Sequence, residues 1–311
     1  MSIFPTRILL ATDGSEDSEV AAKTAATLAA STSSELHLVH VGPGLPLYEL
    51  PDYPARFEEV VKAQRQEAQR VLDEQVRKVE GSGAPVREAH LEMDERADRA
   101  IVELGEKLGV GLVVVGSRGL GRLRRTLMGS VSDSVVRHTH CPVLVVRDGE
   151  REAEYLPGRI LLALDGSEEA SAAALMAVEL ADRVDSELHV VHVGEVTPVY
   201  HPEQHGYLAR YEELQEEARR LLDGQVDKVK SAGGTVARAH LRMGRPDEEI
   251  VVLGEEIGAG LIVTGSRGLG GIRRALLGSV SDSVVRHAHC PVLVVRPQKE
   301  RASERETGLL T

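Results

Sequence analysis

The sequence predicts an α/β protein built from two tandem doubly wound domains, each a five-stranded parallel sheet of order 3-2-1-4-5 flanked by helices. Two observations carry this prediction. The chain repeats itself after about 150 residues, and within each repeat short apolar runs alternate with longer helical patterns. The resulting order β-α-β-α-β-α-β-α-β is typical of parallel sheets, and right-handed crossovers leave only a few topologies for it.

The repeat is a duplication of a whole domain. Its most similar block, GSRGLGRLRRTLMGSVSDSVVRHTHCPVLVVR, returns near the end of the chain with 27 of 32 positions identical. Three earlier blocks, RILLATDGSE, SELHLVHVG and AHLEM, return in the same order as RILLALDGSE, SELHVVHVG and AHLRM. Such a period is too long for a solenoid repeat. We therefore expect one domain at residues 1–148 and another at 159–297, joined by a polar linker at 149–158 and followed by a flexible tail at 298–311.

The elements of the first copy follow one another clearly. The first strand is RILLAT, which stops at an Asp-Gly pair, and the second is ELHLVHV, which stops at Gly-Pro. The third, PVREAHLEM, shows a clearer alternation of apolar and polar residues. By contrast, GLVVVG and PVLVVR are continuous β-branched runs, as expected of strands covered on both faces. A long helical pattern at 56–80 places apolar residues at three- and four-residue steps, and we expect its charged side to be a solvated face.

Composition and charge argue against several classes of protein. The 311 residues carry a formal net charge of −12, so we expect no nucleic-acid partner. No apolar run approaches the ~20 residues that span a bilayer, and we interpret the apolar N-terminus as the first strand rather than a signal peptide. The two cysteines, Cys141 and Cys290, lie at matching places in the two copies, which argues against a disulfide framework and fits a cytoplasmic protein. Cys141 is expected to be a small buried hydrophobe.

The strand order predicts where a ligand would bind. In a doubly wound sheet, ligands sit beyond the carboxyl ends of the strands at the point where the order reverses, here between strands 1 and 4. Strand 1 ends at Asp13 and strand 4 ends at Gly116. These two residues should therefore face one crevice, and Asp165 and Gly265 should do the same in the second copy.

The segment after strand 4 has the chemistry of a phosphate loop. Gly116 and Gly119 let the backbone approach a ligand closely, and Ser130 is expected to be the N-cap of the next helix, with Asp133 at its third position. A helix N-terminus offers unpaired N–H groups and a partial positive charge to an anion. The loop also contains the basic residues Arg118, Arg122, Arg124 and Arg125. The alternative is that the glycines only make turns and Ser130 only caps, but two near-identical copies argue against a loop without function.

The spacing of this loop identifies its type. It matches neither the P-loop pattern G-x-x-x-x-G-K-[ST] nor the dinucleotide pattern G-x-G-x-x-G. Instead both copies contain G-x2-G-x9-G-S, beginning at Gly116 and Gly265. With ATDGSE early and CPVLVV late, the chain resembles the ATP-binding branch of the universal stress proteins in tandem two-domain form. The resemblance covers both domains and implies a Rossmann-like, adenine nucleotide α-hydrolase-like fold.

The resemblance implies an adenine nucleotide site in each domain, with ATP as the ligand and Mg²⁺ as an accompanying ion. In the family, the acid that ends strand 1, backbone at the end of strand 2, and the glycine loop with its serine contact the nucleotide. The implied residues of the first domain are Ala11, Asp13, Val41, Gly116, Ser117, Arg118, Gly119, Gly129, Ser130 and Val131. Those of the second are Ala163, Asp165, Val193, Gly265, Ser266, Arg267, Gly268, Gly278, Ser279 and Val280. The second loop has Gly271 where the first has Arg122, so it should hold phosphate less tightly.

The resemblance also implies how the domains associate. Members of the family pair through their last strands, and a tandem protein forms this pair within one chain, as a pseudo-dimer. Two such chains could associate further as a homodimer. A protein partner that recognises the ATP-bound state is expected, but the sequence does not identify it.

Other interpretations of single residues stay open. Asp13 precedes a glycine and could serve only an Asx-turn. His138 and His140 lie at the expected end of a helix, where a histidine suits the helix dipole, so we predict no metal site there. His40 and His192 close strand 2 of each copy and are either satisfied core groups or neighbours of the adenine.

The sequence favours a binding protein over an enzyme. Phosphoryl transfer needs a metal holder and a group that positions water, and no residue besides Asp13 is placed for either task. We therefore predict no catalytic residues, a nucleotide-dependent regulator of the stress response, and at most slow ATP hydrolysis. The alternative is an ATPase or an enzyme that cleaves ATP at the α-phosphate, which should carry an extra substrate domain or a catalytic cysteine. A ligand-free structural dimer would predict decayed loops, and both loops are intact.

Overall fold

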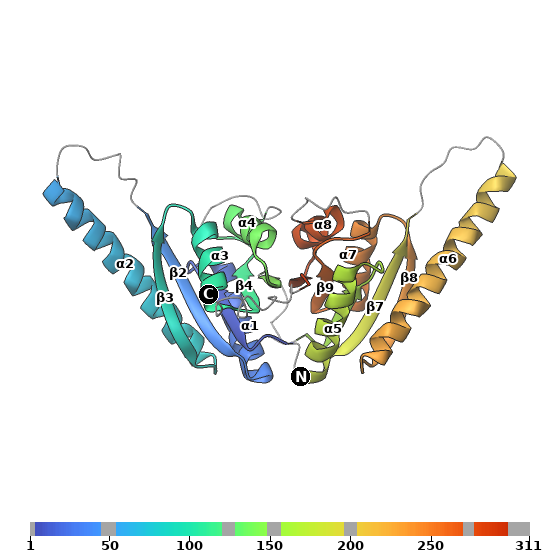
Figure 1. The fold of residues 1–311 in the computed structure, drawn as a ribbon, viewed down its shortest axis with the longest axis horizontal. Helices are drawn as coiled ribbons and strands as arrows, with labels where there is room; N and C mark the ends of the chain where they lie inside the picture. Colours follow the sequence, from blue (N-terminus) through green and yellow to red (C-terminus); the bar gives the residue numbers. More distant parts are fainter. Residues whose placement is uncertain are drawn as a thin grey trace, which may run out of the picture.

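The structure, a computed structural model, describes residues 4–44, 54–119, 128–147, 157–195, 204–269 and 277–297. The predicted α/β class is confirmed, with two domains of the same topology (Figure 1). The strands are β1 (Arg7–Ala11), β2 (Glu35–Pro43), β3 (Val86–Asp94), β4 (Leu112–Gly116), β5 (Val143–Val146), β6 (Arg159–Ala163), β7 (Glu187–Gly194), β8 (Val236–Met243), β9 (Leu261–Gly265) and β10 (Val292–Val295). The helices are α1 (Glu16–Thr32), α2 (Pro54–Gly81), α3 (Ala97–Leu108), α4 (Ser130–His138), α5 (Glu168–Arg183), α6 (Gln204–Ser231), α7 (Pro246–Ile257) and α8 (Ser279–His287).

The strands form one continuous sheet in the order β3-β2-β1-β4-β5-β10-β9-β6-β7-β8. Each half has the predicted order 3-2-1-4-5, and all pairs within a half are parallel. The halves meet where β10 pairs antiparallel with β5, with Leu293 opposite Leu144. The order reverses between β1 and β4 in the first domain, so the carboxyl ends of these strands flank the predicted crevice.

Each sheet is covered on both faces because successive strand residues point to opposite sides. In the first domain Leu10 and Leu38 pack with α1 and α2, whereas Leu9 and Val39 pack with α3 and α4. Strand residues on both faces are almost completely buried, which explains the continuous β-branched runs. The parallel connections therefore place α1 and α2 on one side and α3 and α4 on the other.

The long helices α2 and α6 lie along the outer ends of the sheet (Figure 1). On α2 the apolar stripe is buried at Ala68, Leu72 and Val79, but Val60, nearer the start of the helix, is 41% exposed. The helix therefore covers β2 and β3 with its C-terminal part. Charged residues occupy its other faces, as the sequence predicts.

The domain junction is held by charged groups as well as by β5 and β10. Arg137 of α4 pairs with Asp282 of α8, and Arg286 of α8 pairs with Asp133 of α4. Each of these helices is also capped by the other domain. At the end of α4, the guanidinium of Arg296 donates to the carbonyl oxygens of Val136 and Arg137 at 2.6 and 3.1 Å. Orphan carbonyls at a helix end thus receive donors from across the junction.

None of the helices within the described ranges is both long enough and apolar enough to cross a bilayer. Most of the predicted linker and all of the predicted tail fall outside those ranges.

Candidate functional site

The acid at the end of β1 lies against the glycine loop after β4. In the first domain, the Oδ1 atom of Asp13 accepts the backbone N–H of Ser15 at 3.0 Å, which is an Asx-turn. Its Oδ2 atom faces Gly119, where an added Cβ would lie only 2.4 Å away. One carboxylate therefore both forms the local turn and reaches the loop, so the two interpretations of Asp13 are not exclusive.

The second domain repeats this arrangement. Asp165 accepts the N–H of Ser167 at 2.9 Å with Oδ1 and the N–H of Leu269 at 3.0 Å with Oδ2. A Cβ at Gly268 would again lie 2.4 Å from Oδ2. The acid after strand 1 thus meets the glycine loop in both domains, as the strand order predicts, and backbone donors anchor it there.

The arginine in the glycine loop is held by the helix after β1. Arg118 donates to both carboxylate oxygens of Asp17 at 3.1 and 3.0 Å, and the hydroxyl of Ser117 donates to Asp17 at 2.6 Å. The Asp17 side chain is only 5% exposed, so this pair is protected from solvent screening. In the second domain Arg267 pairs with Glu169 at 2.7 Å. These arginines therefore position the loop on α1 and α5, an arrangement that the sequence did not indicate.

The helix after the loop begins one residue earlier than predicted. Gly129, not Ser130, is the N-cap of α4, and Ser130 is its first helical residue. Asp133 consequently donates its N–H to the carbonyl of Gly129 and occupies the fourth position rather than the third. The second domain has the same arrangement, with Gly278 as the N-cap of α8 and Ser279 as its first helical residue. Since the N-cap is a glycine, no side chain satisfies the first N–H groups of the helix, which remain directed toward the crevice.

The glycines of the motif differ in the reason for having no side chain. A Cβ at Gly116 would lie 2.9 Å from backbone atoms of Asp17 and Ser18, so packing excludes it. At Gly129 an added Cβ would make ordinary contacts of 3.5 Å with Arg118 and Ser117, and its φ of −66° suits any residue. Gly129 is thus not required by the surrounding backbone, which leaves close approach of a ligand as the physical reason for it.

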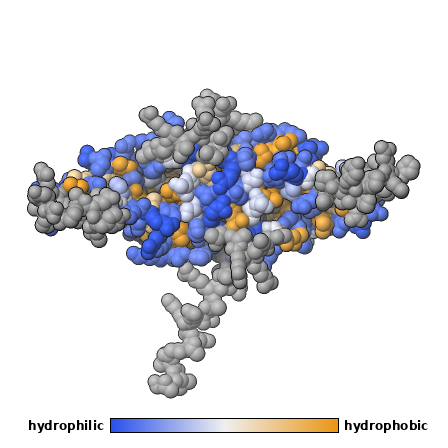
Figure 2. Space-filling view, turned by 90° about the horizontal axis from the view of Figure 1, so that it is seen from above, coloured by the Kyte–Doolittle hydropathy of each residue, from blue (hydrophilic) through white to orange (hydrophobic). Residues whose placement is uncertain are grey.

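A cavity of about 440 Å³ lies beyond the carboxyl ends of the strands in the second domain. This volume is within the range of small-molecule and cofactor sites. Nine of the ten residues implied for this domain line the cavity, namely Ala163, Asp165, Val193, Gly265, Arg267, Gly268, Gly278, Ser279 and Val280. The tenth, Ser266, is 1% exposed and lies behind the lining. The crevice residues, the loop and the start of α8 therefore surround one space. Figure 2 looks onto this edge of the sheet, where hydrophilic residues predominate on the part that is not grey.

Two walls of the cavity come from helices that the sequence did not assign to the site. Leu214, Ala218 and Leu221 contribute from α6, and Pro246 and Ile250 from α7. Leu221 is 44% exposed, although it belongs to the apolar stripe of a helix. Periodicity assigns such residues to a buried face but does not show that the face covers a cavity.

The histidines that close strand 2 are satisfied core groups, which is one of the two interpretations left open for them, and the adenine contact stays a prediction. The Nδ1 atom of His192 lies 2.8 Å from the carbonyl oxygen of Leu164, and the ring also lines the cavity. In the first domain, His40 makes the same contact with the carbonyl of Thr12 at 2.9 Å. Each histidine is a buried, hydrogen-bonded group that fixes the crevice floor.

In the first domain the same elements bring the implied residues together. Ala11 pairs with Val115 in the strand register, and the N–H of Gly129 donates to the carbonyl of Ser117 at 2.8 Å. Val131 is 37% exposed at the start of α4, and Val41 lies on β2. The loop segments 120–127 and 270–276, with Arg122, Arg124, Arg125 and Gly271, lie outside the described residues.

The HTHC segment is not assembled as a metal or nucleophile site. His138 ends α4 and hydrogen-bonds the carbonyl of Ser134 at 2.8 Å, while His140 pairs with Glu106 at 2.8 Å. Burial raises the pKa of the Cys141 thiol to about 11, so it is protonated at neutral pH. The prediction that Cys141 is a small buried hydrophobe holds only in part, because the residue as a whole is partly exposed, whereas its counterpart Cys290 is buried.

Comparison with known proteins yields one family for both halves. Residues 5–147 and 157–296 each match the model of the universal stress protein family. The chain is 29% identical over 299 residues to a universal stress protein of Mycolicibacterium smegmatis, covering 94% of this chain and 97% of that protein. It is 37% identical over 158 residues to one of Methanocaldococcus jannaschii, covering 50% of this chain and 90% of that protein. A solved universal stress protein from Archaeoglobus fulgidus superposes with a TM-score of 0.68 at 26% identity, covering 94% of this chain and 99% of the other.

Proposed function

Because the chain belongs to the universal stress protein family in a tandem form, we propose that it is an ATP-binding regulator of the stress response with one adenine nucleotide site in each domain. We further propose that its ATP-bound state is recognised by a protein partner in the cytoplasm. Hydrolysis of the nucleotide is absent or slow in this proposal.

One observation carries the proposal. The residues that the family resemblance implies for the second domain come from three separate parts of that domain, yet nine of the ten line a single cavity. The cavity also contains the N-terminus of α8, where the glycine N-cap leaves N–H groups without a side-chain acceptor. A mainly apolar enclosure with a few convergent polar groups and a helix N-terminus suits a base joined to phosphates.

The roles of the residues follow from their positions. The backbone of Val193 at the end of β7 would contact the adenine, with Leu214 and Ala218 of α6 covering its apolar faces. Asp165 would contact the sugar from the end of β6. The N–H groups of Ser279 and Val280 would hold the phosphates, while the N–H of Gly278 is used in its bond to the carbonyl of Ser266, and an accompanying Mg²⁺ would neutralise the phosphates.

Slow or absent hydrolysis is supported by the way the nearby titratable groups are used. Both carboxylate oxygens of Asp165 already accept backbone N–H groups, and His192 is bonded to the carbonyl of Leu164. Such anchored groups position a ligand but are poorly placed to orient an attacking water. An ATPase remains the alternative function, and it would need a base from outside this set.

Mass spectrometry of the natively purified, full-length protein tests the proposal directly. We expect a mass increase that corresponds to one or two adenine nucleotides and that disappears on denaturation. A protein purified without nucleotide that also shows no heat of binding with ATP, ADP or AMP would overturn the proposal. Release of labelled phosphate at a rate typical of enzymes would instead favour the ATPase.

A further inference from the structure

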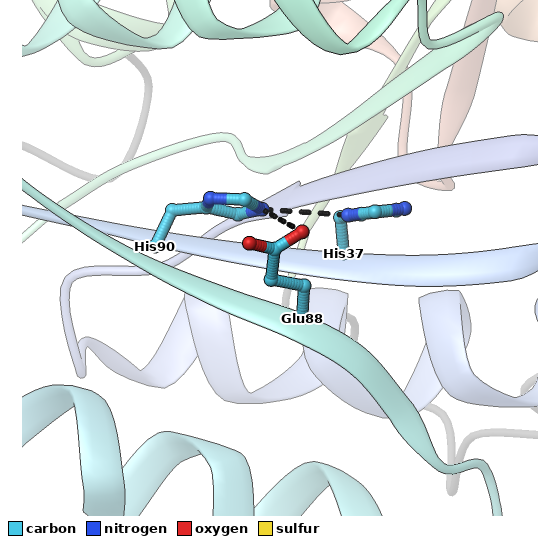
Figure 3. Close-up of side chains that lie close together, drawn as sticks. All are labelled: His37, Glu88 and His90. Atoms are coloured by element: carbon cyan, nitrogen blue, oxygen red, sulfur yellow. Dashed lines mark hydrogen bonds and ion pairs between the residues drawn. The ribbon is translucent and has the colours of Figure 1, made fainter.

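A cluster of metal-ligating side chains lies on the outer strands of the first domain, apart from the nucleotide crevice. His37 of β2 and Glu88 and His90 of β3 bring one ligand atom each to within 4.8 Å of the others (Figure 3). The Nδ1 atom of His37 lies 3.3 Å from Nε2 of His90, and Glu88 Oε2 lies 3.8 Å from the same nitrogen. We propose that these three side chains bind one Zn²⁺ ion.

The strand register creates this cluster. His37 pairs with Glu88, and His90 pairs with Val39, so the three side chains share the face that α3 covers. The register shifts between Leu36 and His37, and such a bulge redirects side chains in an edge pair. Because His37 and His90 are 53 positions apart, no spacing rule for zinc ligands could indicate them from the sequence.

The chemistry of the three groups suits zinc. Two imidazoles and one carboxylate form a donor set of catalytic zinc sites, which leave the fourth position to water. Two nitrogens bound to one tetrahedral ion at about 2.0–2.1 Å lie roughly 3.3 Å apart, which matches the separation of 3.3 Å between His37 and His90. The Glu88 side chain is 62% exposed, so an ion can enter from solvent on its side.

The surroundings prepare His37 to act as a ligand. Its Nε2 atom is buried without a hydrogen bond and lies 3.9 Å from Oε2 of Glu35. A carboxylate behind a metal-bound histidine is a recurrent outer-shell arrangement. The rings of His37 and His90 lie 19° from parallel and end to end, so binding requires the His90 ring to tilt toward Glu88.

The second domain contains the same histidine pair without the carboxylate. His189 Nδ1 and His240 Nε2 are 3.0 Å apart, but Arg238 replaces Glu88 opposite His189. Four residues further along the same strand face, Arg242 stands where the first domain has Glu92. A guanidinium cannot donate a lone pair and repels a cation. The proposal therefore predicts a zinc site in the first domain and none at the matching position of the second.

Zinc titration of the untagged, full-length, metal-free protein tests this difference, with a chromogenic chelator as competitor. Glu88→Arg and His90→Ala should each remove one zinc equivalent, and each should weaken that site by more than the ~10–100-fold that follows loss of an outer-shell partner. His240→Ala is the matched control and should leave zinc binding unchanged. Arg238→Glu together with Arg242→Glu should add a second equivalent.

Direct detection of the ligands completes the test. In nitrogen-resolved NMR of the histidine rings, zinc should shift the signals of His37 and His90 and leave those of His189 and His240 in place. Melting of each variant without metal shows whether it is folded, and zinc should raise the melting temperature of the unaltered protein. Unchanged zinc binding in folded Glu88→Arg and His90→Ala variants would overturn the proposal, as would zinc-induced shifts confined to other histidines.

Discussion

Asp13 contacts the glycine loop so closely that a Cβ at Gly119 would lie 2.4 Å from its Oδ2 atom. The equivalent acid of the second domain, Asp165, accepts the N–H of Leu269 at 3.0 Å in the same place. The loop is therefore held at the strand ends by the residue that the family resemblance assigns to the nucleotide. Nucleotide binding would replace these contacts of the loop or add to them. It would not have to order a loop that was open beforehand.

Replacing both acids should weaken ATP binding without abolishing it. In the double variant Asp13→Ala with Asp165→Ala, each site loses one charged acceptor, while the loop and the helix N-termini remain. A charge-assisted hydrogen bond is worth about 1.5–3 kcal/mol, which corresponds to roughly ten- to a hundred-fold in affinity. Calorimetric titration with ATP measures the change. An affinity equal to that of the unaltered protein would show that these acids only form the local turn.

Valine at both N-cap glycines should abolish ATP binding while the fold persists. Gly129 has a φ of −66°, and an added Cβ there meets only ordinary contacts at 3.5 Å, whereas a Cβ at Gly278 would lie 3.3 Å from the Cα of Arg267 and needs a small local shift. Gly129→Val with Gly278→Val should therefore lower the apo melting temperature only slightly. The side chains would instead occupy the space where phosphates approach the helix ends. Gly224→Val is the control, because an added side chain there meets nothing within 4 Å. A folded double variant that still bound ATP normally would contradict the phosphate-loop assignment.

We expect two nucleotides per chain, because both loops carry the complete motif. Calorimetry of the unaltered protein should give a stoichiometry of two, and Gly129→Val or Gly278→Val alone should reduce it to one. Analytical ultracentrifugation at the same concentrations controls for association of chains. If the unaltered protein bound one nucleotide per chain, and only one of the two single variants abolished that binding, the proposal would be restricted to a single domain.

The arginines that follow the last strands should stabilise the domain junction. Arg147 donates to the carbonyl oxygens of Val285 and Arg286, and Arg296 donates to those of Val136 and Arg137. Burial lowers the pKa of both arginines, so they are partly desolvated charges with defined acceptors. Arg147→Ala with Arg296→Ala should cost about 3–6 kcal/mol in the free energy of unfolding, at 1.5–3 kcal/mol per charged group.

Urea unfolding measures this loss. The exposed pair of Arg99 with Glu103 supplies the control, since Arg99→Ala should change stability by less than about 1 kcal/mol. Equal effects of the junction and control variants would show that the cross-domain caps contribute little.

Stability should also fall in acid because of Asp98. A hydrogen bond from Arg96, and another from Ser134, hold the pKa of Asp98 at about 2, below its ordinary value of 3.8. The folded pKa is depressed, so the stabilisation is complete above about pH 4 and is lost as the pH falls toward 2. The shift is worth about 1–2 kcal/mol after allowance for screening at Arg96, which is 66% exposed. Denaturant titrations at several pH values should show that Asp98→Asn removes this part of the acid dependence, and an unchanged dependence would refute the assignment.

Much of the fold was predictable because it depends on short-range patterns. Alternating apolar runs and helical stretches give the β-α order, and the duplication makes each half confirm the other. The strand order then brings Asp13 and the glycine loop to one edge of the sheet, which the structure confirms. The start of α4 was predicted one residue late, because Ser130 is a better N-cap by residue type than Gly129, and the loop geometry overrides that preference.

The sequence by itself thus determined the two domains, their topology and the loop that faces the crevice, since these follow from local periodicity and from the parallel connections. Only the tertiary structure decided that Arg118 pairs with Asp17 on α1, that α6 and α7 complete the cavity, and that His37 meets His90. Each of these contacts joins residues far apart in the chain, and each depends on helix placement or strand register. The bulge at His37 illustrates the reason, because a shift of one residue in register changes which side chains share a face of the sheet.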